Sequence, residues 1–297
     1  MTRHLLDITD LSPGELRHVL ALSVAAPRRL LEGKGVALVF EKPSNRTRHS
    51  MEMAVVQMGG HPVYTRGEEI GLDTRETVED VTRIMAGYHA VLAARVFDHS
   101  TVLRMAACSA VPVVNMLSDR SHPLQALADM VTMRESVGSP DTLRVAWVGD
   151  YNNVARSLAE AVVMLGGAVS FGCPDGYGPG ADEVARLAAL GGPVRDSSDP
   201  REAVDGANVV HTDTWVSMGQ EAETAARREV FAGYVVDESL MSHAAPGARF
   251  MHCMPAHRGE EVSAEVFDGP RSLVIAQGHH RLTAARGALT FLMEAQG

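Results

Sequence analysis

The sequence alternates between short apolar runs rich in β-branched residues and longer stretches with helical spacing. The runs at residues 36–40 and 89–96 have the length of buried strands. Each is followed by a helix-like stretch, at 51–58 and 100–107. This order predicts an α/β fold whose mainly parallel sheets are flanked by helices. Because the carboxyl ends of parallel strands meet at one edge of a sheet, we expect functional residues in the loops that follow the strands.

One break in the alternation predicts two domains. A chain of 297 residues suits about two domains of ordinary size. A Gly-Ser-Pro turn at residues 138–140 precedes a new strand-like run at 143–148. We therefore place the first domain at residues 1–136 together with a C-terminal helix at 283–297, and the second domain at residues 137–282.

Net charge and hydropathy exclude several classes of partner. The formal charge of -10 argues against binding to nucleic acid or to an anionic membrane surface, so an anionic ligand must be held by a few local cations. No apolar run approaches the roughly 18 residues that cross a bilayer, and the first ten residues lack the apolar core of a signal peptide. Three widely spaced cysteines suit a reducing compartment. The sequence predicts a cytoplasmic protein.

The basic residues argue against common cofactors. Lys34 and Lys42 are the only lysines among 27 lysines and arginines. Neither stands in a Walker phosphate loop, and a pyridoxal Schiff base would have to use one of these two. The turn after residues 143–148 lacks the Gly-x-Gly-x-x-Gly pattern of dinucleotide sites. We predict no cofactor.

The polar stretch at residues 44–48, Ser-Asn-Arg-Thr-Arg, lies between a strand-like and a helix-like segment. Backbone N–H groups at a helix N-terminus, two hydroxyls and two guanidinium groups form a combination that binds phosphate. The alternative is a simple helix cap formed by Ser44 or Asn45, followed by arginines that face solvent. Local sequence alone favours the cap.

Further polar residues follow other predicted strands. Arg95 ends the run at 89–96 and is expected to point into a cleft, although a surface salt bridge explains it equally well. His122 precedes Pro123 at the start of a long helix, where it is expected either to donate a hydrogen bond to an oxyanion or to cap the helix. Asp213 follows another strand and suits binding of an amine. Cys253 ends a further strand and is otherwise an inert small apolar residue.

The C-terminal segment is predicted to contain a strand near residues 272–276, a turn with His279, His280 and Arg281, and an amphipathic helix. Two adjacent histidines suggest a metal site. Carboxylate or cysteine partners at ligand spacing are missing from this segment, so we predict no metal.

Taken together, these motifs resemble those of the aspartate/ornithine carbamoyltransferase family. The matching stretches are SNRTR at 44–48, Arg95, HPLQ at 122–125, DTWVSMGQE at 213–221 and HCMPAHRGEEV at 252–262. They occur in order over essentially the whole chain. The resemblance implies transfer of a carbamoyl group from carbamoyl phosphate to an amine. The Ser-Met-Gly and His-Cys-Met-Pro motifs favour ornithine over aspartate or N-acetylornithine as the acceptor.

The resemblance also implies a role for each matching residue. The first domain would bind carbamoyl phosphate and the second would bind ornithine. Carbamoyl phosphate would be held by Ser44, Asn45, Arg46, Thr47, Arg95, His122, Gln125, Cys253, Met254 and, from the second domain, Arg281. Ornithine would be held by Asn153, Asp213, Ser217, Met218 and Cys253. The residues expected to act in the transfer itself are Arg46, Thr47, Arg95, His122 and Cys253.

The implied chemistry needs little acid–base catalysis, because phosphate is already a good leaving group. The protein must stabilise the tetrahedral oxyanion and orient the amine, and closure of the two domains would exclude water from a labile substrate. The family forms trimers or multiples of trimers, so a homotrimer or a multiple of trimers is expected. Two alternatives remain: another acceptor such as putrescine, and a non-catalytic protein that binds carbamoyl phosphate.

Three positions depart from the family pattern. Asn45 stands where threonine is usual, and a Gly-His-His sequence precedes Arg281 where relatives often have Glu-Asn. Glu69 stands where many relatives have a glutamine that reaches the phosphate site of a neighbouring subunit. A carboxylate there would repel phosphate, so that role is not transferred to Glu69.

Overall fold

The computed structural model describes residues 2–216 and 221–296, and its internal contacts divide the chain into two compact units. The first unit comprises residues 1–131 and 280–297, and the second comprises residues 132–279. The boundaries fall inside two helices, α6 (Pro123–Ser136) and α13 (Val274–Glu294). Each unit contains a parallel sheet with flanking helices, so the predicted α/β class is confirmed.

The first unit is built on a four-stranded sheet in the order β2-β1-β3-β4, in which every pair of neighbours is parallel. Because the strand order reverses between β1 and β3, a crevice for a ligand is expected where their carboxyl ends meet. Its elements before α6 are η1 (Ile8–Asp10), α1 (Pro13–Val24), β1 (Gly35–Phe40), α2 (Asn45–Gln57), β2 (His61–Arg66), α3 (Gly67–Ile70), α4 (Val78–Ala86), β3 (His89–Arg95), α5 (His99–Cys108) and β4 (Val113–Leu117).

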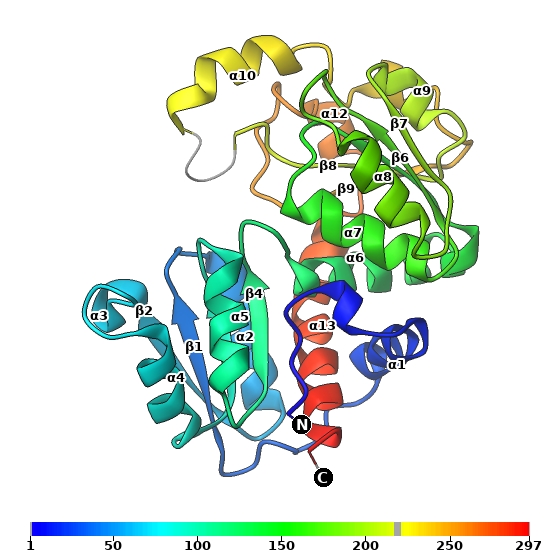
Figure 1. Ribbon diagram of the computed structural model, residues 1–297. Coiled ribbons are helices and arrows are strands. Elements are labelled where there is room, and N and C mark those ends of the chain that lie inside the picture. Colours follow the sequence, from blue (N-terminus) through cyan, green and yellow to red (C-terminus); the bar gives the residue numbers. More distant parts are fainter. Residues whose placement is uncertain (1, 217–220, 297) are drawn as a thin grey trace. The chain divides into compact units, whose positions relative to one another are not determined.

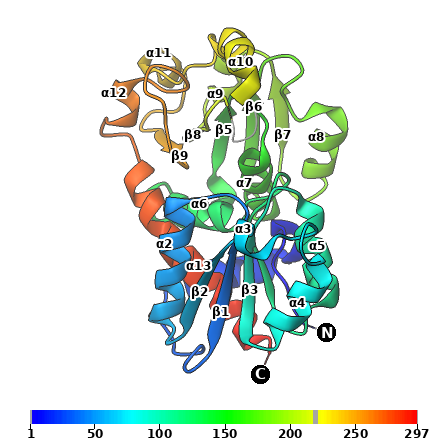
Figure 2. The same cartoon turned by 90° about the vertical axis from the view of Figure 1, so that its left-hand side faces the viewer.

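Helices cover both faces of this sheet. Helix α2 lies on one side of the strands, whereas α4 and α5 lie on the other (Figure 2). Alternate residues of β1, such as Ala37 and Val39, pack with Val78 of α4 and Val102 of α5 in one buried cluster. Burial on both faces explains why β1 and β3 have continuous apolar sequences rather than alternating ones.

The second unit contains a five-stranded parallel sheet in the order β7-β6-β5-β8-β9. Its strand order reverses between β5 and β8, which is the second place where a ligand crevice is expected. Its elements between α6 and α13 are η2 (Pro140–Thr142), β5 (Arg144–Val148), α7 (Asn153–Met164), β6 (Ala168–Gly172), α8 (Gly180–Ala188), β7 (Val194–Ser197), α9 (Pro200–Val204), β8 (Val209–Thr212), η3 (Glu221–Glu223), α10 (Thr224–Phe231), α11 (Glu238–Met241), β9 (Arg249–His252) and α12 (Ala264–Phe267).

The core of the second unit also has two layers of helices. Helices α7 and α8 lie in front of the strands in Figure 1. Strand residues Ala146, Val210 and Phe250 belong to a buried cluster that includes Val204 of α9 and Val266 of α12. In the described part of the chain, no helix combines the length and apolarity needed to cross a bilayer.

The predicted strand and turn near the C-terminus are wrong. Residues 274–294 form the single helix α13, so His279, His280 and Arg281 lie within a helix rather than in a turn. A run of four or five apolar residues fits a buried strand and a buried helix equally well. Here Ser272 makes an isolated bridge with Phe250, and the helix then buries Val274 in the hydrophobic cluster of the second unit.

Candidate active site

The Ser-Asn-Arg-Thr-Arg stretch forms the start of α2, directly after the carboxyl end of β1. The helix begins at Asn45, six residues before the predicted start at 51. The Ser44 hydroxyl accepts a hydrogen bond of 3.3 Å from the Thr47 N–H, so the predicted helix cap exists. The cap and an anion site are compatible, because capping one N–H leaves the positive end of the helix dipole at the same place.

The two arginines of this stretch have different surroundings. Arg48 is exposed, donates a 2.8 Å hydrogen bond to Glu52, and lies 3.7 Å above the ring of Tyr64. Arg46 is half-buried, and no hydrogen bond or ion pair engages it within residues 2–216 and 221–296. Arg48 therefore fits the solvent-facing alternative, whereas the Arg46 guanidinium is available to a ligand.

Thr47 is the centre of a buried polar cluster in the first unit. Its hydroxyl oxygen accepts hydrogen bonds from Arg281 at 2.9 Å and from Arg95 at 3.4 Å. Arg281 also donates to the side-chain oxygen of Gln125. Arg95 and Arg281 are each 5% exposed, which contradicts the surface salt bridge considered for Arg95. Arg281 groups with the first unit, whereas the predicted second domain, residues 137–282, includes it.

His122 lies directly before the first residue of α6 and is 4% exposed. Burial and the positive charges of Arg281 and Arg95 hold the pKa of its imidazole well below 6.5. The ring is therefore neutral at physiological pH. A neutral imidazole next to two guanidinium groups is suited to donate a hydrogen bond, not to deliver a proton.

In the second unit, Asp213 joins the ends of three strands. Its carboxylate accepts hydrogen bonds from Asn152 at 2.9 Å, from the Cys253 thiol at 3.1 Å and from the Thr214 N–H at 2.9 Å. These residues follow β5, β8 and β9, whose carboxyl ends are neighbours in the sheet. Asp213 and Cys253 are half-buried, so a ligand can reach them.

Asn152 is a residue to which the family resemblance assigned no role. Its side-chain oxygen caps α7 by accepting from the N–H groups of Val154 and Ala155, both at 3.0 Å, and its amide nitrogen donates to Asp213. The prediction chose the adjacent Asn153, which is the first residue of α7 and half-buried. Two consecutive asparagines after a strand were the available signal, but only the cap geometry shows which one meets Asp213.

Met254 has an unusual backbone conformation beside Cys253. Its φ of 58° lies in the left-handed region, which is rare for residues other than glycine and tends to occur at functional sites. Its N–H donates a 2.8 Å hydrogen bond to Nδ1 of the buried His252. Directly before Met254, the Cys253 thiol donates a 3.1 Å hydrogen bond to the Asp213 carboxylate.

Comparison with known families gives a match for each part of the chain. The model described as "Aspartate/ornithine carbamoyltransferase, carbamoyl-P binding domain" matches residues 3–135. The model described as "Aspartate/ornithine carbamoyltransferase, Asp/Orn binding domain" matches residues 141–292. The chain belongs to the aspartate/ornithine carbamoyltransferase family. The resemblance inferred from the sequence motifs is thus confirmed.

Individual members of this family are similar over nearly the full length. The ornithine carbamoyltransferase of Acidothermus cellulolyticus is 46% identical over 307 residues, covering 100% of this chain and 98% of the relative. The anabolic ornithine carbamoyltransferase of Pyrococcus furiosus is 44% identical over 274 residues, covering 91% and 87%. The solved structure of a P. furiosus ornithine carbamoyltransferase aligns with a TM-score of 0.93 at 42% identity, covering 98% of this chain and 97% of that one.

Several residues considered in the sequence make none of the site contacts described above. Ser217 and Met218, predicted to bind ornithine, lie outside the described residues. Asn45 is exposed in the first turn of α2. Glu69 accepts a 3.1 Å hydrogen bond from the backbone N–H of Arg66, so its carboxylate is engaged within its own unit.

The residues around Asp213 in the second unit are poorly arranged to bind a metal ion. Asp213, His252 and Cys253 have ligand atoms within 4.8 Å of one another. However, both ring nitrogens of His252 are engaged, Nδ1 by the Met254 N–H and Nε2 by Glu261 at 3.1 Å. A metal would have to displace one of these bonds in a fully buried side chain, so the arrangement fits an organic amine better.

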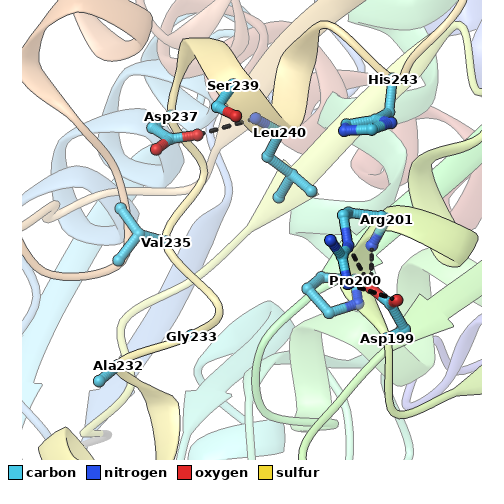
Figure 3. A pocket seen from close by; sticks show the side chains of 10 residues that line it. All are labelled: Asp199, Pro200, Arg201, Ala232, Gly233, Val235, Asp237, Ser239, Leu240 and His243. Carbon is cyan, nitrogen blue, oxygen red and sulfur yellow. Dashed lines mark hydrogen bonds and ion pairs between the residues drawn. The ribbon is translucent and has the colours of Figure 1, made fainter.

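The second unit also contains a pocket that none of the described carbamoyltransferase motif residues lines. Figure 3 shows that it lies beside α9 and α11 and is lined by Arg201, Asp237 and His243, among others. Arg201 donates to Asp199 at 3.0 Å, and Asp237 accepts a 2.8 Å hydrogen bond from the Leu240 N–H. Because these charged groups already have partners, we do not assign the reaction to this pocket.

Proposed function

We propose that this protein transfers the carbamoyl group of carbamoyl phosphate to the side-chain amine of L-ornithine, giving L-citrulline and phosphate. The observation that carries the proposal is the cluster around Thr47. Two buried arginines converge on one hydroxyl at the N-terminus of α2, and a third, Arg46, is available beside it. A doubly charged phosphate group compensates such a concentration of positive charge.

The two units have complementary roles in this proposal. The first unit binds carbamoyl phosphate: Ser44, Asn45, Arg46 and Thr47 hold the phosphate, while Arg95, His122, Gln125 and Arg281 hold the carbamoyl end. The second unit binds ornithine through Asn153, Asp213, Ser217 and Met218, and Cys253 and Met254 contribute to both substrates. The support in the second unit is the Asp213 carboxylate, whose negative charge attracts an amine and orients it.

The chemical step follows from these groups. The neutral amine nitrogen of ornithine attacks the carbonyl carbon, a tetrahedral oxyanion forms, and the carbon–oxygen bond to phosphate breaks. The departing phosphate accepts the proton released by the amine. Arg95, Thr47 and the neutral His122 stabilise the oxyanion through hydrogen bonds fixed before the reaction, which avoids reorganisation during the step.

Product formation from carbamoyl phosphate with a panel of amines tests the proposal. Ornithine, N-acetylornithine, putrescine, lysine and aspartate are supplied in turn, and we expect citrulline from ornithine with far slower turnover of the others. Faster turnover of another amine would replace the acceptor and keep carbamoyl transfer. Binding of carbamoyl phosphate without turnover of any amine would instead favour a non-catalytic binding protein.

We further propose a homotrimer, or a multiple of trimers, that acts in arginine biosynthesis in the cytoplasm. Support for assembly comes from exposed apolar side chains on α2 and the edge strand β2, namely Met53, Val56 and Val63. The anabolic name of the P. furiosus relative supports a biosynthetic direction. Three free cysteines suit the cytoplasm. Light scattering during size-exclusion chromatography tests the assembly, and a monomer at micromolar concentration would contradict it.

A further inference from the structure

Four buried polar side chains lie next to the carboxyl ends of β8 and β9. His211, His252 and Glu261 are 0% exposed and Gln277 is 1% exposed. We call these four residues the Gln277 network, because Gln277 contacts both histidines. Buried polar groups are retained at a cost unless their hydrogen bonds are made, so a connected set of them specifies one arrangement.

Gln277 connects strand β9 to strand β8 through its two amide atoms. Its oxygen accepts a 2.9 Å hydrogen bond from the backbone N–H of His252. This bond fixes the orientation of the amide, so the nitrogen is the atom 3.0 Å from Nε2 of His211. An amide nitrogen can only donate, and Nε2 of His211 must therefore accept.

The same bond determines the tautomer of His211. With Nε2 accepting, the proton lies on Nδ1, which is 3.0 Å from the carbonyl oxygen of Thr212 and donates to it. The ring also stacks on Trp147, with a centroid separation of 5.0 Å and an interplanar angle of 18°. Gln277 thus fixes the backbone immediately before Asp213.

His252 is fixed in a complementary way. Its Nδ1 accepts from the Met254 N–H, so its proton lies on Nε2, which donates to Glu261 at 3.1 Å. Burial acts to raise the pKa of the Glu261 carboxyl, but hydrogen bonds from His252 and from the His257 N–H outweigh it and hold that pKa below its ordinary value. Glu261 therefore stays ionised and keeps the proton of His252 on Nε2.

The network holds the residues that precede the two site residues. Thr212 and His252 are the last register pair of β8 and β9, and Asp213 and Cys253 follow them. After this pair, no strand pairing among the described residues holds the two segments side by side. The Cys253 sulfur nevertheless lies 3.1 Å from the Asp213 carboxylate. Gln277 is the described side chain that contacts His252 on one strand and His211 on the other.

We propose that Gln277, acting through His211 and His252, is a positioning residue for the acceptor amine: it holds the Asp213 carboxylate and the Cys253 thiol at the spacing that orients this amine for attack. The inference rests on the proposed function, since it assigns the amine to Asp213. It adds a residue that touches neither substrate. Misplacing reacting groups by about 1 Å costs up to about 100-fold in rate, so loss of the network is expected to affect the ornithine half of the reaction.

The experiment compares three variants by steady-state kinetics with each substrate varied in turn. Gln277→Leu removes both hydrogen bonds and is expected to raise the ornithine KM and lower kcat, together roughly 10- to 100-fold in kcat/KM for ornithine. The KM for carbamoyl phosphate is expected to rise much less than that for ornithine. Cys253 and Met254 contribute to its binding, but the cluster around Thr47, which the variant leaves intact, supplies its other contacts. Gln277→Glu keeps the acceptor for the His252 N–H and is expected to recover part of the loss.

Val274→Ala is the matched control, since it removes buried apolar volume from the same helix without touching the network. It is expected to lower thermal stability and leave the ornithine KM unchanged. An equal rise in both KM values, or an equal ornithine effect in Val274→Ala, would overturn the positioning role. Nitrogen-15 NMR of the wild-type histidines is an independent readout, and a proton on Nε2 of His211 would also overturn it.

The unmodified protein separates this inference from the function on which it rests. No citrulline from the wild type would overturn the proposed function and the inference together. Normal wild-type turnover with an unchanged ornithine KM in Gln277→Leu would overturn the inference alone. If Gln277→Leu does not fold, the kinetics of Gln277→Glu and the His211 tautomer decide the question.

Discussion

The two units hold their candidate site residues in different ways. In the first unit, Thr47 and Gln125 are buried, and each accepts a hydrogen bond from the buried Arg281. In the second unit, Asp213 and Cys253 are half-buried, and the Gln277 network holds the strand residues that precede them. The difference follows from charge. Several cations can be kept close together only by a dense set of hydrogen bonds, whereas one carboxylate for an amine needs access and a defined direction.

The comparison predicts its largest effect for Arg46, which no side chain of the described residues engages. Arg46→Ala is expected to lower kcat/KM for carbamoyl phosphate about 10²–10³-fold, because it removes a charge proposed to bind the phosphate group. Arg48→Ala is the matched control two residues away. It loses an exposed ion pair with Glu52, so it is expected to change kcat/KM less than about threefold. Near-wild-type turnover of Arg46→Ala with a normal melting temperature would show that the phosphate site lies elsewhere.

A smaller effect is expected in the second unit, and it should fall on the other substrate. Asp213→Asn keeps an oxygen acceptor but removes the charge, so the ornithine KM is expected to rise about 10- to 100-fold, the range for hydrogen bonds to charged groups. The carbamoyl phosphate KM is expected to stay nearly constant. Asp205→Asn, at an exposed position, serves as the control. If Asp213→Asn raises both KM values equally, the division of substrates between the units is wrong.

The smallest effect concerns the cost of keeping His122 neutral next to two arginines. The pKa of His122 in the folded protein is held below 6.5. Between that lower pKa and 6.5, the unfolded chain therefore binds more protons than the folded protein. The free energy of unfolding is thus expected to fall as the pH is lowered through 6.5. A full pKa unit corresponds to about 1.4 kcal/mol, or roughly 2–4 °C in a protein of this size.

The measurement is the melting temperature of wild type and His122→Asn between pH 7.5 and pH 5.5. His4, His89 and His99 also have lowered pKa values through burial, so both proteins are expected to lose stability in acid. The variant is expected to lose less. Parallel curves for the two proteins would contradict the assignment of a depressed pKa to His122.

Much of the fold was predictable because its signals are local. The apolar runs before Glu41 and Val96 became β1 and β3, and the Pro123 signal marked the start of α6. The strand β7 was missed because Val194–Ser197 is partly exposed and lacks an apolar run. The C-terminal strand was wrongly predicted because a short apolar run does not distinguish a strand from a buried helix.

The candidate site residues could be selected one by one from the sequence, but their arrangement could not. Ser44, Thr47, Arg95 and Asp213 were selected because they follow strands or open helices. Asn152 was not assigned to the site because two consecutive asparagines do not show which one meets Asp213. Gln277 was not selected because a glutamine inside a helix carries no distinctive sequence pattern. Their importance appears only where the side chains meet Asp213 and His252.

The sequence by itself determined the order of most strands and helices, and with it the residues that end most of the strands. These properties depend on neighbouring residues, whose periodicity reflects the backbone geometry of each element. The tertiary structure alone decided which of those ends meet. The bond from Arg281 to Thr47 spans 234 residues, and that from Gln277 to His211 spans 66. Such contacts depend on the order of strands in the sheets and on the path of α13, because side chains distant in sequence meet only when the packed core brings their elements together.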